Sequence, residues 1–425
     1  MKRRHFIQTG VLGAGAVTLL GTQACAAGEN PDVSEASEAL PGPIAALESR
    51  AGEAPPPITE EERAARRARA QELLAESGVD ALFVEPGASL TYFAGVRWGR
   101  SERTFGLLLP RRGEPVIVCP AFEKERAEKS TGGRFEIRVW QEDESPFALI
   151  GGIMRDWGRA TGRLALEEST RFFVAQGIGR DAGSLDLASG DPITHRCRGI
   201  KSAHEIEIMR FANRITVEAI EAAFASLREG TTQRELGRNI RAAFERLGFG
   251  GGWVLPLIGE SSAYPHGSDN PTPLREGDVV LVDTGTTVHG YQSDITRTTV
   301  FGTPSDEVRR VFETVREAQW RALEFAAPGR TCGEVDAVAR KVITDAGFGP
   351  GYAYFTHRLG HGIGLEGHEW PYLVGNSRVV LEPGMTFSDE PGIYQYGKFG
   401  VRLEDIMAIT ETGAELLTEP VAPMA

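Results

Sequence analysis

The chain has 425 residues, of which 41% are hydrophobic and 25% are charged. This length exceeds one typical domain of about 150 residues, so we expect two or three domains, and the composition is that of a globular protein with a full core. The formal net charge of −13 argues against the basic surface that nucleic-acid-binding proteins carry, so no nucleic-acid partner is expected.

Residues 1–26 have the pattern of an export signal peptide rather than of a folded element. Three basic residues precede an apolar stretch over 6–21, and Cys25 lies between two alanines in a small-residue cleavage site. The stretch is shorter than the about 20 residues that span a bilayer, so no stable membrane span is expected. The paired arginines resemble a twin-arginine signal, which predicts a periplasmic protein. An ordinary secretory signal and lipoprotein anchoring at Cys25 are the alternatives.

The residues after the signal predict a linker and then a small domain. Residues 27–57 are rich in Ala, Glu, Pro and Gly and lack apolar periodicity, which is typical of a flexible linker. A helix is expected from Thr59 to about Ser77, because acidic residues fill its first turn. Short apolar runs predict strands at 81–84, 105–109, 115–119 and 163–166. The alternation of helices and strands indicates a small α/β domain over 58–195.

A second domain is predicted over 196–425. It begins with a helix that ends near Phe224, where apolar residues recur at helical spacing. From Val279 onward the pattern changes to strands whose ends carry acidic residues and histidines. The cysteines outside the signal are Cys119, Cys197 and Cys332. They show no metal-ligand spacing and are odd in number, so we interpret them as structural.

Two aspartates stand at the first of these strand ends. The apolar run 279–282 leads directly into Asp283, which is followed by Thr-Gly. Asp294 begins an alternating run in which Thr296 and Thr298 lie on the same face as Asp294. Either aspartate alone would be read as a turn residue.

A histidine and two glutamates follow in the same region. His361 lies within Gly360–Gly364, where small neighbours allow another group to approach closely. Glu390 follows the predicted strand 385–389 and precedes Pro-Gly. Glu404 lies two residues after an arginine, so the two side chains share a face.

Together, these five residues predict a metal site. Four carboxylates that converge with one histidine are costly unless cations neutralise them, and two divalent ions would do so. A set of oxygen ligands with one imidazole suits manganese, cobalt, iron or zinc. A water between two such ions becomes a hydroxide nucleophile at neutral pH, which is how paired metals drive hydrolysis.

In order and type, the five residues resemble the metal ligands of the pita-bread metallopeptidases, which include prolidase, aminopeptidase P and methionine aminopeptidase. The surrounding segments match as well: 282–285, 293–298, 360–364, 389–392 and 402–405. The resemblance is strong over 198–415 and looser over 58–190, where 93–95 and 120–123 look like a creatinase-type N-terminal domain. It implies an α/β (α+β) fold with a small creatinase-like α/β N-terminal domain followed by a pita-bread catalytic domain.

The resemblance also implies roles for individual residues. The implied metal ligands are Asp283, Asp294, His361, Glu390 and Glu404. The implied catalytic residues are His266, His357, His368, Glu390 and Arg402. The implied substrate-binding residues are His266, Tyr264 and Tyr394. An amide oxygen gains negative charge in the transition state, which is why donors such as these histidines are needed. Arg402 is expected to brace Glu404 or bind an intermediate, with a plain ion pair to Asp405 or Asp294 as the alternative.

The implied activity is hydrolysis of the Xaa-Pro bond in dipeptides or short peptides by two metal ions, with manganese expected. Aminopeptidase P activity on longer Xaa-Pro-peptides is the alternative, and a non-catalytic peptide-binding module is a remote one. A dipeptidase needs a cation for the substrate carboxylate, and the candidates are Arg358, Arg378 and Lys398. The resemblance further implies small peptide substrates with proline at the second position and a homodimer.

Overall fold

The computed structural model describes residues 39–250, 252–269 and 271–424. Its N-terminal domain is a six-stranded mixed sheet with the order β4-β3-β2-β1-β5-β6. The strands are β1 (Ala81–Val84), β2 (Gly106–Pro110), β3 (Val116–Pro120), β4 (Glu136–Trp140), β5 (Arg163–Leu166) and β6 (Asp186–Ser189). The central strand β1 pairs antiparallel with β2 and parallel with β5.

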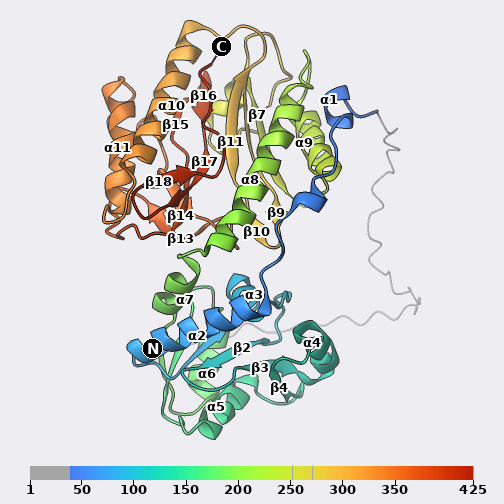
Figure 1. The fold of residues 1–425 in the computed structure, drawn as a ribbon, viewed down its shortest axis with the longest axis vertical. Coiled ribbons are helices and arrows are strands. Elements are labelled where there is room, and N and C mark those ends of the chain that lie inside the picture. Colours follow the sequence, from blue (N-terminus) through green and yellow to red (C-terminus); the bar gives the residue numbers. More distant parts are fainter. Residues whose placement is uncertain (1–38, 251, 270, 425) are drawn as a thin grey trace, which may run out of the picture. The chain divides into compact units, whose positions relative to one another are not determined.

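Helices cover both faces of this sheet (Figure 1). They are α2 (Glu60–Glu76), α3 (Ala88–Ala94), α4 (Lys124–Thr131), α5 (Pro146–Asp156), α6 (Phe172–Asp181) and α7 (Asp191–Arg198). Leu82 and Val84 of β1 pack with residues of α2, α3 and α7, whereas Ala81 and Phe83 pack with residues of α5 and α6. Because strand side chains alternate between faces, a strand covered on both sides needs a continuous apolar run, which is what β1 has.

The second domain contains two halves, each with two helices followed in the chain by antiparallel strands. The first half has α8 (Ala203–Phe224) and α9 (Gln233–Leu247), then a sheet of order β11-β8-β7. Its strands are β7 (Trp253–Ile258), β8 (Val279–Gly285) and β11 (Ile295–Val300), with a hairpin of β9 (Thr287–Val288) and β10 (Tyr291–Gln292). Apolar residues of α8, α9 and β8 form one core cluster.

The second half has α10 (Asp306–Phe325) and α11 (Cys332–Asp345), then a sheet of order β13-β12-β14-β17-β18. Its strands are β12 (Gly360–Gly362), β13 (Glu369–Leu373), β14 (Thr386–Asp389), β17 (Asp405–Ile409) and β18 (Ala414–Leu416). A separate pair is formed by β15 (Gly392–Gln395) and β16 (Phe399–Arg402). An antiparallel bridge between Thr296 and Glu404 joins the two halves, so the strand ends of both meet there.

The prediction of a flexible linker over 27–57 is wrong for the described part, residues 39–57. This part contains α1 (Gly42–Ala45) and a 3-10 turn (Ala51–Glu53). Ile44 is fully buried in the core cluster of α8 and α9, and Arg50 forms an ion pair with Glu218 at 3.1 Å. The low apolar content misled the prediction, because three apolar residues of the segment, Ile44, Leu47 and Ala54, pack against the same core cluster.

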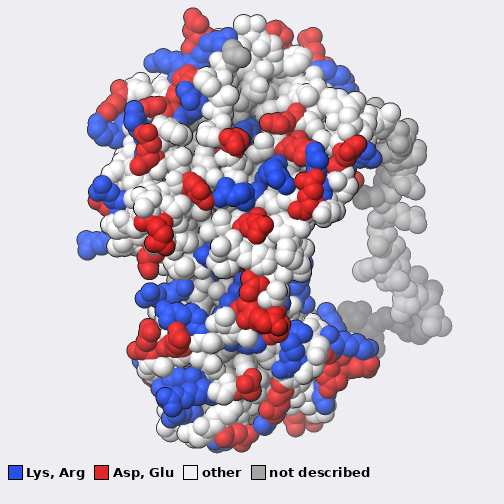
Figure 2. Space-filling model, viewed as in Figure 1, with Lys and Arg blue, Asp and Glu red and all other residues white. Residues whose placement is uncertain are grey.

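Several other sequence expectations concern single elements or segments. Cys119, Cys197 and Cys332 are free and buried, as expected of structural cysteines. The predicted signal peptide, residues 1–26, lies outside the described residues. Among the residues described, no helix is both long enough and apolar enough to cross a membrane. On the face that Figure 2 shows, basic and acidic side chains of the described residues are interspersed rather than gathered into one basic surface.

Candidate metal centre

The fold brings all five predicted ligands to one place. Asp283 lies in β8 and Asp294 immediately precedes β11, and these two strands are paired. His361 lies in β12, Glu390 directly follows β14, and Glu404 lies between β16 and β17. Ligand atoms of these five residues lie within 4.8 Å of one another in two overlapping groups, one of Asp283, Asp294 and Glu404 and one of His361, Glu390 and Glu404. A third such group joins Asp294 and His361 to His368. Two overlapping groups suit two neighbouring ions.

Burial and mutual repulsion act on the carboxylates of this cluster. Asp294 and Glu404 are buried, and burial together with the neighbouring carboxylates raises the pKa of both well above its usual range. Burial also raises the pKa of Glu390, to about 7. Oδ1 of Asp283 and Oδ1 of Asp294 are buried without a hydrogen-bond partner among the described residues. Unpaired buried oxygens in a carboxylate cluster fit a divalent cation.

His361 is prepared as a neutral ligand. Burial lowers its pKa to about 3, so the imidazole is uncharged at neutral pH. Its Nδ1 lies 3.1 Å from the carbonyl oxygen of Gly362, which leaves Nε2 facing Oε1 of Glu390 at 3.3 Å and Oδ2 of Asp294 at 3.8 Å. Position 360 requires glycine, because a Cβ there would lie 1.9 Å from the carbonyl oxygen of Ser388.

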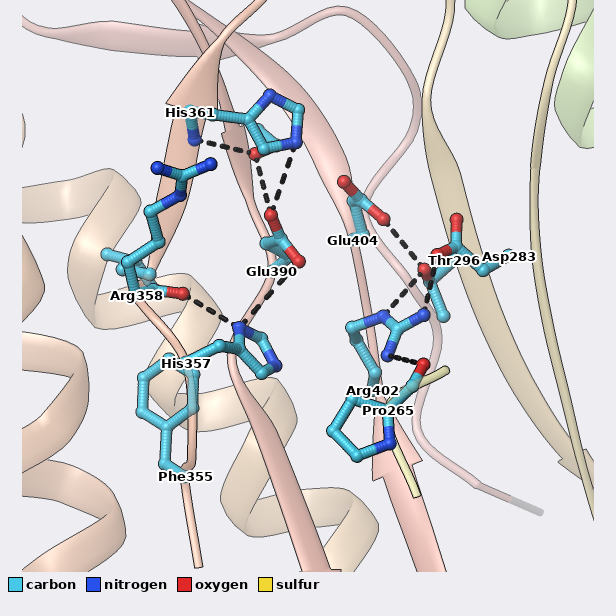
Figure 3. A network of polar contacts seen from close by, with 12 residues as sticks. Pro265, Asp283, Thr296, Phe355, His357, Arg358, His361, Glu390, Arg402 and Glu404 are labelled. Carbon is cyan, nitrogen blue, oxygen red and sulfur yellow. Dashed lines mark hydrogen bonds and ion pairs between the residues drawn. The ribbon is translucent and has the colours of Figure 1, made fainter. Parts of the chain in front are cut away.

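Arg402 contacts two carboxylates of the cluster, Asp283 directly and Glu404 through Thr296 (Figure 3). Its Nη2 donates to Oδ2 of Asp283 at 2.6 Å, and its Nε donates to Oγ1 of Thr296 at 3.0 Å. The Thr296 hydroxyl in turn donates to Oε2 of Glu404 at 2.7 Å. Arg402 therefore braces Glu404 through a threonine, and the ion-pair partner of Asp405 is Arg297 instead.

His357 faces Glu390, and its Nδ1 lies 2.8 Å from the carbonyl oxygen of Arg358 (Figure 3). Its Nδ1 lies 3.9 Å from Oε2 of Glu390, and its Nε2 lies 2.7 Å from the hydroxyl of Tyr394. Burial lowers the pKa of His357 to about 3, so it is neutral. Arg340 on α11 donates to the carbonyl oxygen of His357 at 2.9 Å and pairs with the buried Asp336. An Asp-Arg pair at i, i+4 on a helix is usually a surface feature, so the sequence carries no signal of this role.

His368 and Arg358 lie beside the cluster and are more accessible. The ring of His368 stacks on His361 with centroids 3.7 Å apart, and Nη2 of Arg358 lies 3.2 Å from Nδ1 of His368. The guanidinium of Arg358 stacks on the ring of Tyr372. In contrast, Lys398 is paired with Glu307 on α10 at 2.9 Å, so Arg358 is the better placed of these two cations.

The remaining predicted residues form two different environments. His266 is exposed, and Tyr264 lies against the exposed Tyr396 with ring centroids 5.2 Å apart. Tyr394 is fully buried, and its hydroxyl lies 3.0 Å from Nη1 of Arg402 in addition to its contact with His357. Tyr394 therefore supports two groups of the site, whereas contact with a substrate stays a prediction for all three residues.

Comparison with known proteins identifies the family. The model of metallopeptidase family M24 matches residues 207–411, and that of the creatinase/prolidase N-terminal domain matches residues 66–200. The Xaa-Pro dipeptidase of Lactobacillus delbrueckii subsp. lactis is 34% identical over 357 residues, which cover 82% of this chain and 95% of that protein. The chain belongs to metallopeptidase family M24. The predicted family and fold class are thereby confirmed.

Solved structures of similar proteins agree with this assignment. The dipeptidase PepE from Mycobacterium ulcerans is 33% identical with a TM-score of 0.81, covering 87% of this chain and 99% of that one. The X-Pro aminopeptidase from Thermotoga maritima MSB8 is 30% identical with a TM-score of 0.71, covering 84% of this chain and 98% of that one. The chain is thus a metallo-exopeptidase of this family, with residues arranged for metal-dependent hydrolysis.

Proposed function

We propose that the protein is an Xaa-Pro dipeptidase that uses two divalent metal ions, with manganese as the expected metal and cobalt, iron or zinc as alternatives. The observation that carries this proposal is the buried cluster of four carboxylates around the neutral His361, in which two carboxylate oxygens have no partner among the described residues. The similarity to the Lactobacillus Xaa-Pro dipeptidase supports the substrate class.

The proposed ligands are Asp283, Asp294, His361, Glu390 and Glu404. Two divalent ions held by them would supply an acidified water as nucleophile and neutralise the carboxylates. Glu390 would hold the proton that this water loses and deliver it to the leaving nitrogen, because its carboxyl group lies in the cluster, with Oε1 3.3 Å from Nε2 of His361. Ser388 donates to Oε1 of Glu390 at 3.1 Å and so fixes the orientation of the carboxyl group.

The proposed role of His357 and His368 is to stabilise the amide oxygen as it gains negative charge. Donors placed in advance at that oxygen stabilise the transition state because they need no reorganisation. Tyr394 orients His357 and links it to Arg402, since the tyrosine hydroxyl contacts both side chains. In this arrangement, Arg402 also keeps Asp283 turned toward the cluster.

Two surfaces beside the cluster suit the proline residue of an Xaa-Pro dipeptide, one its carboxylate and the other its ring. Arg358 is the proposed partner of the substrate carboxylate, because its guanidinium lies next to His368 and is stacked on Tyr372. Tyr264 and His266 are proposed to hold the proline ring on an aromatic shelf. An Xaa-Pro bond has no N–H to donate, and a site that relies on polarising the carbonyl does not need one.

Release of the first residue from longer Xaa-Pro-peptides is the second candidate function. The similarity to the X-Pro aminopeptidase of Thermotoga maritima favours it. A non-catalytic peptide-binding module is the remote alternative, and the complete ligand set argues against it, because a binder has no need of these costly carboxylates.

The deciding experiment is hydrolysis of Ala-Pro and Ala-Pro-Ala by the purified protein, with and without manganese, beside the variant Glu390→Ala. We expect manganese-dependent cleavage of Ala-Pro that the variant loses. Release of alanine from the tripeptide would instead establish aminopeptidase P activity. If neither substrate is cleaved by the metal-loaded protein, the proline assignment is wrong.

Export and dimerisation complete the proposal. The pattern of residues 1–26 supports twin-arginine export to the periplasm, with lipoprotein anchoring at Cys25 as the alternative. Fractionation of cells that express the full chain, with Arg3 and Arg4 changed to lysine as the control, tests the route. The homodimer is proposed from the family resemblance alone, and light scattering of the purified protein tests it.

A further inference from the structure

The turn that carries His368 is held at both ends by one arginine of the segment between the two domains. Nη2 of Arg198, the last residue of α7, lies 2.5 Å from Oε2 of Glu366 and 2.5 Å from Oε2 of Glu369. His368 lies between these two glutamates in sequence. A single guanidinium therefore fixes the backbone of the turn on either side of the histidine.

A second cation completes the arrangement at Glu369. Nζ of Lys201 lies 2.6 Å from Oε1 of Glu369, so each carboxylate oxygen of Glu369 has its own cation. Both side chains are buried, with 1% of Lys201 and 6% of Glu369 exposed. Burial alone would raise the pKa of Glu369, but Lys201 and Arg198 outweigh it and keep the pKa below its usual value, so the carboxylate is charged.

The backbone at Gly364 lies close against this ion pair. A Cβ at Gly364 would lie 2.6 Å from Oε1 of Glu369 and 2.9 Å from Cε of Lys201. The carbonyl oxygen of Gly364 accepts from the backbone N–H of Gln292 at 2.8 Å, which ties the same turn to β10. The glycine thus allows a close approach that a side chain would prevent.

Arg198 is itself anchored in the N-terminal domain. Its Nη1 donates to Oγ of Ser89 at 3.2 Å, and Ser89 donates to Oε2 of the buried Glu167 at 2.5 Å. The polar chain therefore runs from the N-terminal sheet, through Arg198, to the residue that follows His368.

His368 needs such support because its own side chain is weakly held. It is exposed, and its interactions among the described residues are the stacking on His361 and one contact with Arg358. A buried ion pair contributes little net stability compared with apolar residues of the same size, since desolvation of both charges offsets their attraction. A contribution to stability is thus a weak explanation for the presence of Arg198, Lys201 and Glu369 beside the site.

We propose that Arg198, Lys201 and Glu369 are positioning residues that hold His368 in its reactive orientation and so couple the N-terminal domain to the chemical step. This inference rests on the proposed hydrolysis of Xaa-Pro and on the proposed role of His368 in it. It makes the segment between the domains, residues 198–201, part of the catalytic apparatus rather than a plain connection.

The test is a double-mutant cycle between Arg198→Met and His368→Ala in manganese-loaded protein with Ala-Pro as substrate. We expect Arg198→Met to lower kcat at least tenfold with KM changed less than twofold, because His368 acts on the transition state. We expect no further loss, within twofold, when Arg198→Met is added to His368→Ala, because the histidine through which Arg198 acts is already gone. The manganese content of both variants should stay at the wild-type value.

The matched control is Arg111→Met in the N-terminal domain. Asp80, like Glu369, is a carboxylate held by two cations, Arg111 at 3.2 Å and Arg159 at 3.3 Å, and it lies away from the metal cluster. We expect this variant to keep its kcat within twofold. If Arg198→Met is too unstable to purify, Glu366→Gln removes only the more exposed partner, and a kcat loss that disappears in the His368→Ala background is expected there as well.

The outcomes separate the two proposals. Wild-type protein that cleaves no Xaa-Pro substrate contradicts the proposed function itself. If the wild-type protein is active, the proposed function stands. If the losses of kcat caused by Arg198→Met and His368→Ala then multiply in the double variant, the positioning role is overturned. The positioning role is also overturned if Arg111→Met lowers kcat as much as Arg198→Met does.

Discussion

Tyr394 is a buried residue whose hydroxyl joins two groups of the site, His357 at 2.7 Å and Arg402 at 3.0 Å. Removing the hydroxyl by Tyr394→Phe keeps the ring packing and loses both contacts. We expect kcat for Ala-Pro to fall about tenfold, less than the about 10²–10³-fold that loss of a direct transition-state donor costs. Steady-state kinetics measure this change in kcat. The control is Tyr396→Phe, because Tyr396 is 58% exposed. An unchanged kcat in Tyr394→Phe would show that the hydroxyl has no part in orienting His357.

The protonation of the carboxylate cluster predicts how metal binding depends on pH. Burial raises the pKa of Asp294 and Glu404 well above the usual range and that of Glu390 to about 7, whereas His361 is already neutral. Ligand carboxyl groups must lose their protons when a metal binds. We therefore expect manganese binding to release protons and to be tighter at pH 8 than at pH 6. Calorimetry in buffers of different ionisation enthalpy measures the proton release.

The same groups fix the sign of the pH effect on stability. A carboxyl group whose pKa is raised in the folded state binds a proton that the unfolded chain has lost, so stability falls as the pH rises. For Glu390 this loss extends from its ordinary value of 4.5 to about 7. The increase in Tm on adding manganese should therefore be larger at pH 8 than at pH 6, as measured by differential scanning calorimetry. Equal increases at both pH values would contradict the raised pKa values.

The ligands could be predicted from the sequence because each belongs to a short motif at a strand end, such as Asp283 after an apolar run. The residues that hold the site could not. Arg340, which holds the backbone of His357, lies 17 residues before it on another element. Arg198, which holds the turn of His368, lies 171 residues before Glu369. Their roles arise only when separate elements pack together, and the local periodicity of apolar residues does not predict that packing.

At the scale of elements, β1, β2, β3 and β5 were predicted within about one residue, whereas β4 and β6 were missed. The missed strands lie at the two edges of the sheet. Most of their residues are at least partly exposed, so β4 and β6 lack the apolar run that marks a buried strand. An apolar run thus predicts only strands that are buried on both faces. Edge strands are partly exposed and lack such a run.

The segment containing α1 is a test of how much one buried residue stabilises a short element. Ile44 is fully buried against α8 and α9, so Ile44→Ala should lower the free energy of unfolding by about 2–5 kcal/mol. Urea unfolding measures the change, with Glu48→Ala on the exposed side of the same segment as the control. A change below about 0.5 kcal/mol, the usual range for surface substitutions, would mean that the segment does act as a tether.

At the scale of the whole molecule, residues 40–425 form one compact unit, in which buried polar contacts join the two domains. Arg66 on α2 of the N-terminal domain contacts Glu205 on α8 at 3.0 Å, and both contact the hydroxyl of Tyr291 on β10. Arg198, which binds both Ser89 and Glu369, and His204 on α8, which contacts Glu62 on α2 at 2.7 Å, add further polar connections. The domains should therefore unfold in one transition, because neither can separate without exposing buried charges that would lose their partners.

The Arg66–Glu205 pair allows this coupling to be measured. The side chains are 9% and 4% exposed, so Arg66→Met leaves the charge of Glu205 buried without its ion-pair partner and should destabilise the protein by about 3–5 kcal/mol. The double variant Arg66→Met/Glu205→Met removes both charges and should be more stable than the single variant, since no unpaired charge remains.

Urea unfolding followed by circular dichroism measures the stability of both variants. The control is the exposed pair Arg210–Glu415, whose side chains are 43% and 52% exposed, and for which single and double variants should differ little. A double variant less stable than Arg66→Met would contradict this account, because it would mean that Glu205 stabilises the junction through Tyr291 and the helix α8 rather than through its pairing with Arg66.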